Sequence, residues 1–415
     1  MKILLTNIGL LSGLHTTDDL LRGQELAILP SLSNAYLLIQ GDTIVNFGSM
    51  LELQNANVEA DKIIDVRKGH VLPAWCDSHT HLVFAASRET EFIDKIKGLS
   101  YAEIAAKGGG ILNSAAKLQA TSEEELFQSA LQRLQEIALL GTGAVEIKSG
   151  YGLTLDAELK MLRVIQRLKK HSPLEIRATF LGAHAYPPAF RDDHEGYIHQ
   201  LIHDMLPIIA KEKLADYIDV FCEEGFFSPE ETERILAAGI EYGLTPKIHA
   251  NQLHLSGGVQ VGVKMNALSV DHLETMDQES IQLLGSSNTI GTLLPNAAYF
   301  LRMSDPPARK LIESGAAIAL ASDYNPGSAP SGNMNGVISQ ACIRMRMLPE
   351  EAINAATLNG AHAMGLENKC GSIRQGKLAN LIITKPIPSL AYIPYAFGTN
   401  LIEQVIVKGQ LLSGN

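Results

Sequence analysis

Hydrophobic and polar positions alternate in two different ways along this chain. Near the start, AYLLIQGDTIVNFGS (35–49) has two short apolar runs around Gly41 and Asp42, which is typical of a β-hairpin. The C-terminal segments GSIRQGKLANLIITK and EQVIVKGQLL are β-rich in the same way. We therefore expect residues 1–65 and 370–415 to form one small β-sandwich domain from both chain ends, with the middle of the chain inserted between them.

The middle of the chain, residues 66–369, alternates short apolar runs with longer segments that have helical spacing. Eight such runs follow one another: HVLPAWCDSHTH, GTGAVEIKSG, LEIRATFLGAH, YIDVFCEEG, GLTPKIHAN, NALSVDHLE, NTIGTLLP and AAIALASD. Eight β/α repeats predict an α/β fold, the (β/α)8 TIM-type barrel, which typically takes about 250 residues. A doubly wound open sheet is the alternative, but no Gly-rich phosphate loop follows the first run.

Residue types suited to metal binding and proton transfer stand at the ends of these apolar runs: His79, His81, His184, His249, His272 and Asp323. A barrel of this type builds its active site at the C-terminal ends of its strands. His79 and His81 are two residues apart, so in a strand both side chains point to the same side. A lone histidine at a strand end is more often an ordinary polar residue. The pair together with His249 and Asp323 indicates a catalytic Zn or Fe site.

Charge and cysteine usage narrow the class of protein. The net charge is −11 and no basic cluster occurs, which argues against a nucleic-acid or anionic-membrane partner. The four cysteines form no CxxC pair, as expected for a reduced cytoplasmic chain without a disulfide framework. The start, MKILLTNIGLL, is interpreted as a strand and not as a signal peptide, and no apolar run is long enough to span a bilayer. We expect a cytoplasmic protein that acts on a small molecule.

Four motifs in order along the chain, DSHTHLVFA, IHANQL, SVDHLE and ALASDYNPGS, resemble the amidohydrolase superfamily. EIKSGYGL, FLGAHAYP and SDYNPGSAPSGNM are similar to the branch that opens a cyclic amide, 4-imidazolone-5-propanoate, to N-formimidoyl-L-glutamate in histidine degradation. The resemblance covers essentially the whole chain, including the split β domain. It implies a metal-dependent hydrolase, and relatives suggest a homodimer.

The resemblance also implies the metal ligands. Two-metal members carry a carboxylated lysine at the end of the fourth strand, whereas VFCEEG offers no lysine here. We therefore expect one Zn or Fe ion, held by His79, His81, His249 and Asp323. Lys148 ends the second strand, and we interpret it as part of a structural ion pair. Glu223 and Glu224 are expected to support the site or to cap a helix.

Hydrolysis needs a nucleophile and a proton for the leaving nitrogen. A bound metal lowers the pKa of its water to about 7, so a hydroxide could attack the ring carbonyl. Asp323 would accept the proton of that water, and His272 would act as acid or base or stabilise the oxyanion. His272 as a further metal ligand is the alternative. Gln252 stands where related deaminases have a proton-shuttling Glu; its amide can only form hydrogen bonds, which favours lactam hydrolysis over deamination.

The resemblance assigns seven residues to substrate binding: Arg88, Tyr151, His184, Gln252, Asn325, Gly327 and Ser328. The Arg88 guanidinium suits the carboxylate tail because it can hold two oxygens. Asn325 offers a donor and an acceptor, and backbone near Gly327 can approach a ligand closely. A plain surface turn is the alternative for YNPGSAPSG.

Two further readings complete the sequence picture. The segment Lys107–Ile111 is Gly-rich but lacks the Lys-Ser/Thr ending of a phosphate loop, and we expect a mobile lid there. A deaminase of the same superfamily is the first rival function, and a barrel that serves only as an assembly scaffold is the second. Gln252 argues against the deaminase, and the complete ligand set argues against the scaffold.

Overall fold

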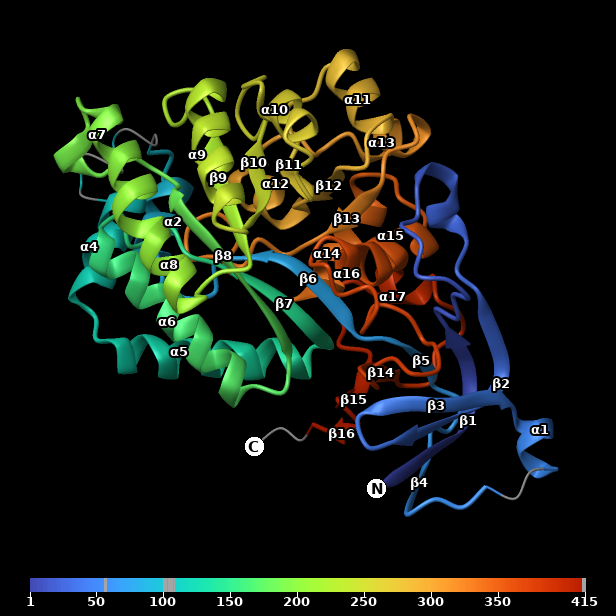
Figure 1. Cartoon of the computed structure of the whole chain (residues 1–415). Coiled ribbons are helices and arrows are strands. Elements are labelled where there is room, and N and C mark those ends of the chain that lie inside the picture. The colour runs from blue at the N-terminus through green and yellow to red at the C-terminus, as the bar shows by residue number, and fades with distance from the viewer. Residues whose placement is uncertain (56–57, 100–102, 104–106, 108, 413–415) are drawn as a thin grey trace.

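The computed structural model of the chain describes residues 1–55, 58–99, 103, 107 and 109–412. It has two parts: a barrel surrounded by helices and a β-sheet that lies against one end of it (Figure 1). The first and the last strands along the chain, β1 (Lys2–Ser12) and β16 (Gln410–Leu411), both belong to this second part. The middle of the chain is therefore inserted between its two ends, as predicted.

The first sheet contains strands from both ends of the chain. Its order is β16-β15-β14-β5-β1-β2-β3, and β4 pairs with β1. The strands are β1 (Lys2–Ser12), β2 (Ser31–Gln40), β3 (Thr43–Ser49), β4 (Lys62–Asp65), β5 (His70–Pro73), β14 (Leu381–Thr384), β15 (Ile402–Val407) and β16 (Gln410–Leu411). The predicted hairpin is confirmed: β2 and β3 are antiparallel, and Gly41 turns with φ of 64°, which a glycine adopts at little cost.

This sheet folds back over an apolar core. Thr43 of β3 forms a bridge with Leu378, just before β14. Strands β3 and β14, which are far apart in the order of the sheet, therefore come close together. The two layers of the expected sandwich thus belong to one continuous sheet. Because β5 pairs with both β1 and β14, the sheet extends to Pro73, beyond the predicted boundary at residue 65. Its core is formed by aliphatic side chains from β1, β2, β3, β5, β14 and β15, among them Leu5, Leu37, Ile39, Val71, Leu381 and Ile406.

The second sheet is the barrel. Within the described residues its order is β13-β12-β11-β10-β9-β8-β7-β6, and neighbouring strands in this order are parallel. The strands are β6 (Trp75–Thr80), β7 (Thr142–Lys148), β8 (Glu175–Ala183), β9 (Tyr217–Cys222), β10 (Thr245–Ala250), β11 (Ser269–His272), β12 (Ile290–Leu293) and β13 (Ile318–Leu320). The backbone N–H of Asp323 donates to the His79 carbonyl at 3.0 Å and links the last strand to the first. The predicted (β/α)8 barrel is confirmed, and the open sheet is wrong.

Helices cover the outside of the barrel (Figure 1). They are α2 (Glu89–Ile96), α4 (Ile111–Ala120), α5 (Glu123–Leu139), α6 (Leu155–His171), η2 (Pro188–Phe190), α7 (His194–His199), η3 (Gln200–Met205), α8 (Leu206–Glu212), α9 (Pro229–Glu241), α10 (Gly258–Lys264), α11 (Gln278–Gly285), α12 (Pro295–Leu301), α13 (Ala308–Glu313), α14 (Met334–Ile343), α15 (Pro349–Ala356), α16 (Leu358–His362) and α17 (Tyr392–Tyr395). Two short helices, η1 (Gly23–Ala27) and α1 (Met50–Gln54), belong to the N-terminal region.

The long helices begin where the sequence supplies capping residues. Ser122 accepts from the Glu125 backbone at 3.2 Å, and the Glu125 carboxylate accepts from the Ser122 backbone at 3.1 Å. Ser228 and Glu231 form the same capping box at the start of α9. Each box satisfies backbone N–H groups that have no partner inside the helix. These helices start at fixed residues, which sets the length of the loops between strands and helices.

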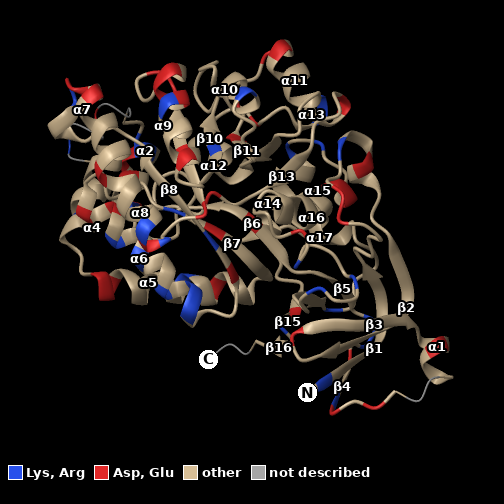
Figure 2. Cartoon of the chain, in the orientation of Figure 1, with Lys and Arg blue, Asp and Glu red and all other residues tan. Residues whose placement is uncertain are grey.

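The exterior of the molecule carries charges of both signs. Figure 2 shows Lys and Arg interspersed with Asp and Glu over outer helices such as α5, α6 and α9. This distribution agrees with the acidic but unclustered charge of the sequence. Among the described helices, none combines the length and the apolar character that crossing a membrane requires.

The interior of the barrel differs from the usual layers of Val, Ile and Leu. Side chains two residues apart on each strand point to the same side, and on four strands this inward row is polar or charged. Six inward residues are at most 1% exposed: Glu146, Lys148, Asp219, Lys247, Ser269 and Asp271. This charged layer is close to the strand ends at which the functional histidines lie.

Candidate active site

Three histidines converge at the C-terminal ends of β6 and β10. His81 Nε2 lies 3.3 Å from His79 Nε2 and 3.3 Å from His249 Nε2, and all three side chains are buried. Burial, together with the positive charge of Lys148 and neighbouring imidazoles, lowers the pKa of each ring well below its ordinary value. Neutral imidazoles that turn lone pairs toward one point repel each other unless a cation lies between them. The three donors therefore fit a metal ion.

Asp323 completes the cluster. Its Oδ1 is 3.6 Å from His79 Nε2 and 3.7 Å from His81 Nε2. Its Oδ2 accepts a hydrogen bond from Ser328 Oγ at 3.0 Å, which directs Oδ1 toward the histidines. Burial raises the pKa of this carboxyl to about 6. Asp323 has φ of 55°, a conformation that costs a non-glycine residue free energy and that often marks a functional position.

Two buried aspartates hold the histidines from behind. His79 Nδ1 is 2.7 Å from Asp271 Oδ2, and His249 Nδ1 is 3.0 Å from Asp219 Oδ2. An ionised carboxylate only accepts hydrogen bonds, so His79 Nδ1 donates to Asp271 and its Nε2 keeps the lone pair for a metal. His249 Nδ1 lies close to Asp219 without the geometry of a hydrogen bond, and Asp219 holds His249 through the backbone N–H, which donates to Oδ1 at 3.1 Å. Sequence reasoning missed both aspartates. The available signal was an acidic residue inside an otherwise apolar strand.

His272 lies beside the cluster at the end of β11. Its ring centre is 5.3 Å from that of His249 and 5.6 Å from that of His79. Burial alone would lower the pKa of His272, but the carboxylates of Glu274, Asp323 and Asp271 hold it above the ordinary value. Glu274 Oε1 is 3.4 Å from His272 Nδ1 and is a partner that sequence reasoning missed. His272 is thus suited to carry a proton.

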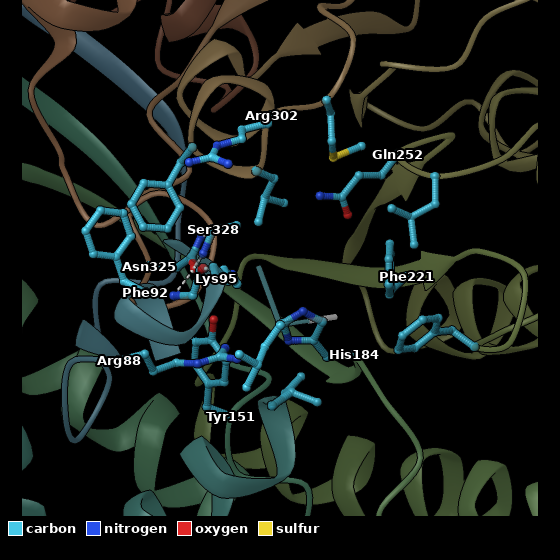
Figure 3. A pocket seen from close by; sticks show the side chains of 18 of the residues that line it. Arg88, Phe92, Lys95, Tyr151, His184, Phe221, Gln252, Arg302, Asn325 and Ser328 are labelled. Carbon is cyan, nitrogen blue, oxygen red and sulfur yellow. Dashed lines mark hydrogen bonds between the residues drawn. The ribbon is translucent and has the colours of Figure 1, made fainter. Parts of the chain in front are cut away.

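A cavity of about 700 Å³ opens beside this cluster. All seven predicted substrate residues line it: Arg88, Tyr151, His184, Gln252, Asn325, Gly327 and Ser328. Figure 3 shows Arg88, Tyr151 and His184 on one side of the cavity and Gln252 and Arg302 on the other. Aromatic and aliphatic side chains and two further cations, Lys95 and Arg302, also line it; these the sequence reasoning did not identify. The cavity therefore combines an apolar wall with groups that attract an anion.

Tyr151 and His184 connect the cavity to the histidine cluster. Their ring centres lie 5.8 Å and 5.2 Å from that of His81. His184 Nδ1 donates to the Gly150 carbonyl at 3.1 Å, and burial lowers the pKa of His184 to about 4. The ring is therefore neutral at pH 7 with Nε2 as an acceptor. Burial raises the pKa of Tyr151, so its phenol remains a hydrogen-bond donor.

Arg88 is held in place by Glu91, three residues later in α2. Glu91 Oε2 accepts from Arg88 Nε at 2.8 Å and from Nη2 at 2.6 Å. The remaining nitrogen, Nη1, faces Gly327, where a Cβ atom would overlap with it. A side chain at position 327 would therefore displace the guanidinium from its present place. The loop also lies near Lys95, whose Nζ donates to the Gly327 carbonyl at 3.4 Å.

The loop after Asp323 is organised by Asn325. Its Nδ2 donates to the Asp323 carbonyl at 2.6 Å and to Ser328 Oγ at 2.7 Å. Its Oδ1 accepts from the backbone N–H groups of Gly327 at 2.7 Å and Ser328 at 2.8 Å. The amide of Asn325 therefore shapes the loop that carries Ser328 to Asp323. A direct contact of Asn325 with substrate stays a prediction.

Other sequence expectations have different outcomes. Lys148 forms the expected buried ion pair, with Glu146 and Asp219, each at 2.7 Å. Glu223 supports the loop after β10, because its Oε2 accepts from the Leu253 backbone at 2.8 Å. Glu224 is exposed. The expected lid at 107–111 includes residue 108, which lies outside the described residues.

Comparisons with known proteins agree with this geometry. The model of the Amidohydrolase family matches residues 70–412. A protein of Flavobacterium johnsoniae named imidazolonepropionase is 57% identical over 99% of this chain and 100% of its own length. One of Geobacillus thermodenitrificans with the same name is 41% identical, over 94% of this chain and 92% of its own length.

Solved structures share the fold at low sequence identity. Triazine hydrolase from Arthobacter aurescens superimposes with a TM-score of 0.75 at 16% identity, over 99% of this chain and 94% of its own. An adenosine deaminase from Xanthomonas campestris, solved with bound zinc, has a TM-score of 0.71 at 14% identity, over 99% and 92%. These structures show the fold alone, whereas the family match and the full-length relatives show that the chain belongs to the amidohydrolase family and, within it, to the imidazolonepropionases.

Proposed function

We propose that this chain hydrolyses 4-imidazolone-5-propanoate to N-formimidoyl-L-glutamate, a step of histidine degradation. The proposal rests on one observation, namely that two features of the structure lie side by side. A cluster of three histidines and Asp323 lies beside a cavity whose wall includes Arg88, Tyr151 and His184. The first feature suits attack of water on an amide carbonyl, and the second suits a small polar ring with a carboxylate tail. The full-length relatives named imidazolonepropionase support the same substrate.

One metal ion, zinc or iron, would be held by His79, His81, His249 and Asp323. When bound, it supplies Lewis acidity, which lowers the pKa of a water molecule and polarises a carbonyl group. The hydrogen bond from His79 Nδ1 to Asp271 keeps His79 in the tautomer that such an ion requires, and the carboxylate of Asp219, 3.0 Å from His249 Nδ1, favours the same tautomer of His249. Imidazole and carboxylate ligands suit zinc and iron about equally well.

The cavity residues would orient the ring. His184 offers an acceptor at Nε2 for a ring N–H, and the Tyr151 phenol offers a donor to an acceptor of the substrate. Arg88 presents Nη1 on the cavity side, because Glu91 occupies its other edge. This leaves a positive charge for the propanoate tail. Gln252, on the opposite wall, can donate or accept through its amide.

Asp323 and His272 would move the protons. Water adds its oxygen to the ring carbonyl carbon, and Asp323, whose pKa is raised to about 6, takes the proton. The bond between that carbon and the ring nitrogen then breaks. The nitrogen needs a proton as it leaves, and His272, whose pKa is raised by the carboxylate of Glu274, is placed to supply it or to stabilise the oxyanion. The ring opens to a carboxylate and a formimidoyl amine.

The test is a substrate comparison. Purified metal-replete protein is incubated with 4-imidazolone-5-propanoate, and the product is identified by mass spectrometry and NMR. Guanine, adenosine and cytosine serve as deaminase substrates, with released ammonia as the readout. We expect N-formimidoyl-L-glutamate and no ammonia. Release of ammonia from an aminated ring at a higher kcat/KM would overturn the proposal, as would the absence of ring opening.

We further propose a cytoplasmic homodimer. The four cysteines are free thiols, which fits a reducing compartment. Apolar side chains of two packed helices and the turn that follows face solvent: Ile343 is 61%, Tyr395 77% and Phe397 72% exposed. A second copy could cover them. Sedimentation velocity should give twice the mass of 44.9 kDa, and a monomer at micromolar concentration would contradict this assembly.

A further inference from the structure

A buried ammonium group lies beneath the histidine cluster. Lys148, at the end of β7, has no exposed surface. Its Nζ is 2.7 Å from Glu146 Oε1, 2.7 Å from Asp219 Oδ2 and 3.4 Å from Asp271 Oδ2. The three N–H groups of one ammonium can thus be shared among three carboxylates. The three carboxylates that Lys148 contacts belong to strands β7, β9 and β11.

The oxygens that Lys148 contacts are those that hold the histidines. Asp219 Oδ2 also faces His249 Nδ1, at 3.0 Å, and Asp271 Oδ2 also faces His79 Nδ1, at 2.7 Å. Asp219 holds His249 by a hydrogen bond to its backbone, since Asp219 Oδ1 accepts from the His249 backbone N–H at 3.1 Å. Lys148 thus contacts two aspartates, and each aspartate in turn lies against a histidine that points at the proposed metal position.

Electrostatics explains why such an arrangement needs the cation. Two carboxylates buried side by side repel each other and lose their hydration, and only a close positive charge compensates both. Burial alone would lower the pKa of Lys148, but Asp219, Glu146 and Asp271 outweigh it and raise the pKa above the ordinary value. Lys148 therefore stays charged and keeps both aspartates available as acceptors.

The barrel contains a matched lysine with a different role. Lys247 on β10 is equally buried, and its Nζ donates to the carbonyls of Ser78 and Ala363, each at 3.2 Å. Its ion pair among the described residues is with Glu146. Lys247 thus shares the burial, the charge and one partner of Lys148, and its charge also helps to hold the pKa of Asp271 low. Its hydrogen bonds and ion pair, however, do not include the oxygens that face His79 and His249.

We propose that Lys148 is a positioning residue of the metal centre. Its ammonium fixes Asp219 and Asp271, and through them it holds His249 and His79 with Nε2 directed at the metal. The proposal rests on the metal site of the proposed function but not on its substrate. Loss of such supporting contacts typically weakens metal binding by about 10–100-fold.

The experiment compares Lys148→Met with Lys247→Met in the full-length protein. The probe is Zn²⁺ alone, and its Kd is measured by competition with a chromogenic chelator. Thermal melting of the metal-free proteins measures the general cost of removing a buried charge. We expect both variants to melt earlier, and Lys148→Met to bind Zn²⁺ about 10–100-fold more weakly than Lys247→Met, because Lys148 contacts both aspartates directly. Equal loss of Zn²⁺ affinity in the two variants, or no loss in Lys148→Met, would overturn the proposal.

A second pair of variants covers the case in which Lys148→Met does not fold. Asp271→Asn alone is compared with Asp271→Asn combined with Lys148→Met, which removes one negative and one positive charge together. In Asp271→Asn alone, Lys148 is still present and still holds Asp219. The combined variant lacks this contact as well, so it should bind Zn²⁺ more weakly than Asp271→Asn. Equal affinities would contradict the proposal. A wild-type protein that binds Zn²⁺ but opens no imidazolone ring would refute the substrate assignment and leave this inference standing.

Discussion

The two sheets of this molecule bury their inner faces in opposite ways. The sheet built from both chain ends packs aliphatic side chains such as Leu37 and Ile39 against each other. The barrel instead encloses Lys148, Asp219 and Asp271 beneath its metal cluster. Apolar burial stabilises a fold at roughly 25 cal/mol per Å². A buried ion cluster adds little or no stability over apolar residues of equal size.

The two sheets therefore have different roles, one in stability and the other in orienting the active groups. The apolar sheet can be altered at a cost in stability, while the active groups stay in place. The barrel interior cannot be replaced by aliphatic side chains without releasing the histidines that it orients. Residues that break the usual pattern of a buried strand are therefore expected where geometry matters for chemistry. The predictions below separate these two roles.

The largest effect is expected from removing a metal ligand. His249→Ala should lose bound metal and reduce turnover. Loss of one hydrogen bond to the transition state typically slows an enzyme by about 10²–10³-fold, and we expect a larger reduction here. Its circular dichroism should match the wild type, because a barrel strand end is altered and the apolar sheet is not. Metal content is measured by elemental analysis. A His249→Ala variant that keeps its metal content and its turnover would contradict the proposed ligand set.

His272→Gln should leave the metal in place and slow the chemistry. General acid–base catalysis contributes about 10²–10⁴-fold, so kcat should fall by that range while the metal-to-protein ratio is unchanged. Glu274→Gln serves as the matched control and should show a smaller loss, because the imidazole remains. A variant with full kcat would refute the acid–base role of His272, and one without metal would make His272 a ligand.

Arg88→Met tests the tail-binding side of the cavity. A hydrogen bond to a charged group is worth about 1.5–3 kcal/mol, so kcat/KM should fall by about 10–150-fold, mainly through KM. Gly327→Ala should have the same type of effect, because its methyl group overlaps with Arg88 Nη1. Steady-state kinetics checks both variants. Unchanged KM values in both would exclude Arg88 from substrate binding.

Leu37→Ala probes the apolar sheet. Leu37 is fully buried on β2, and its truncation should lower the free energy of unfolding by about 2–5 kcal/mol. Because the sheet does not contribute to the cavity lining, kcat/KM per folded molecule should stay at the wild-type value. Urea unfolding and kinetics on the same sample are the measurements. A loss of kcat without a loss of stability would contradict the division between the two sheets.

The smallest effect concerns pH and His15, which lies between the two parts. His15 Nε2 donates to Asn354 Oδ1 at 3.0 Å, and burial lowers the pKa of His15 below 6.5. The unfolded chain then binds a proton more readily, so stability is lost as pH falls through about 6.5 toward the lower native pKa. His15→Gln, which keeps a donor, should show a flatter stability profile between pH 7 and 5. A slope equal to that of the wild type would contradict this assignment.

The sequence predicts the architecture well because strand ends are visible in it. The eight apolar runs each contain a barrel strand, and HxH at the end of the first run reveals the direction of two side chains. The seven residues assigned by resemblance all line one cavity. Spacing within a strand and the parallel arrangement of strands are local and repetitive properties, which a linear pattern records directly.

The supporting contacts could not be predicted in the same way. Asp219 and Asp271 lie 30 residues before and 22 residues after His249, and their pairing with His249 and His79 depends on which strands are neighbours and in which register. The Arg88–Gly327 approach likewise joins residues far apart in the chain. A charged residue inside an apolar strand was the available signal, but it does not specify its partner.

The central claim is that His79, His81, His249 and Asp323 form one metal site on which ring opening depends. The most direct measurement is to strip the protein of metal with a chelator and add Zn²⁺ or Fe²⁺ back in steps while following 4-imidazolone-5-propanoate turnover. The structure predicts no turnover in the stripped protein and a linear rise that ends at one metal per chain. Full turnover after metal removal, or a rise that ends only at two metals per chain, would contradict it.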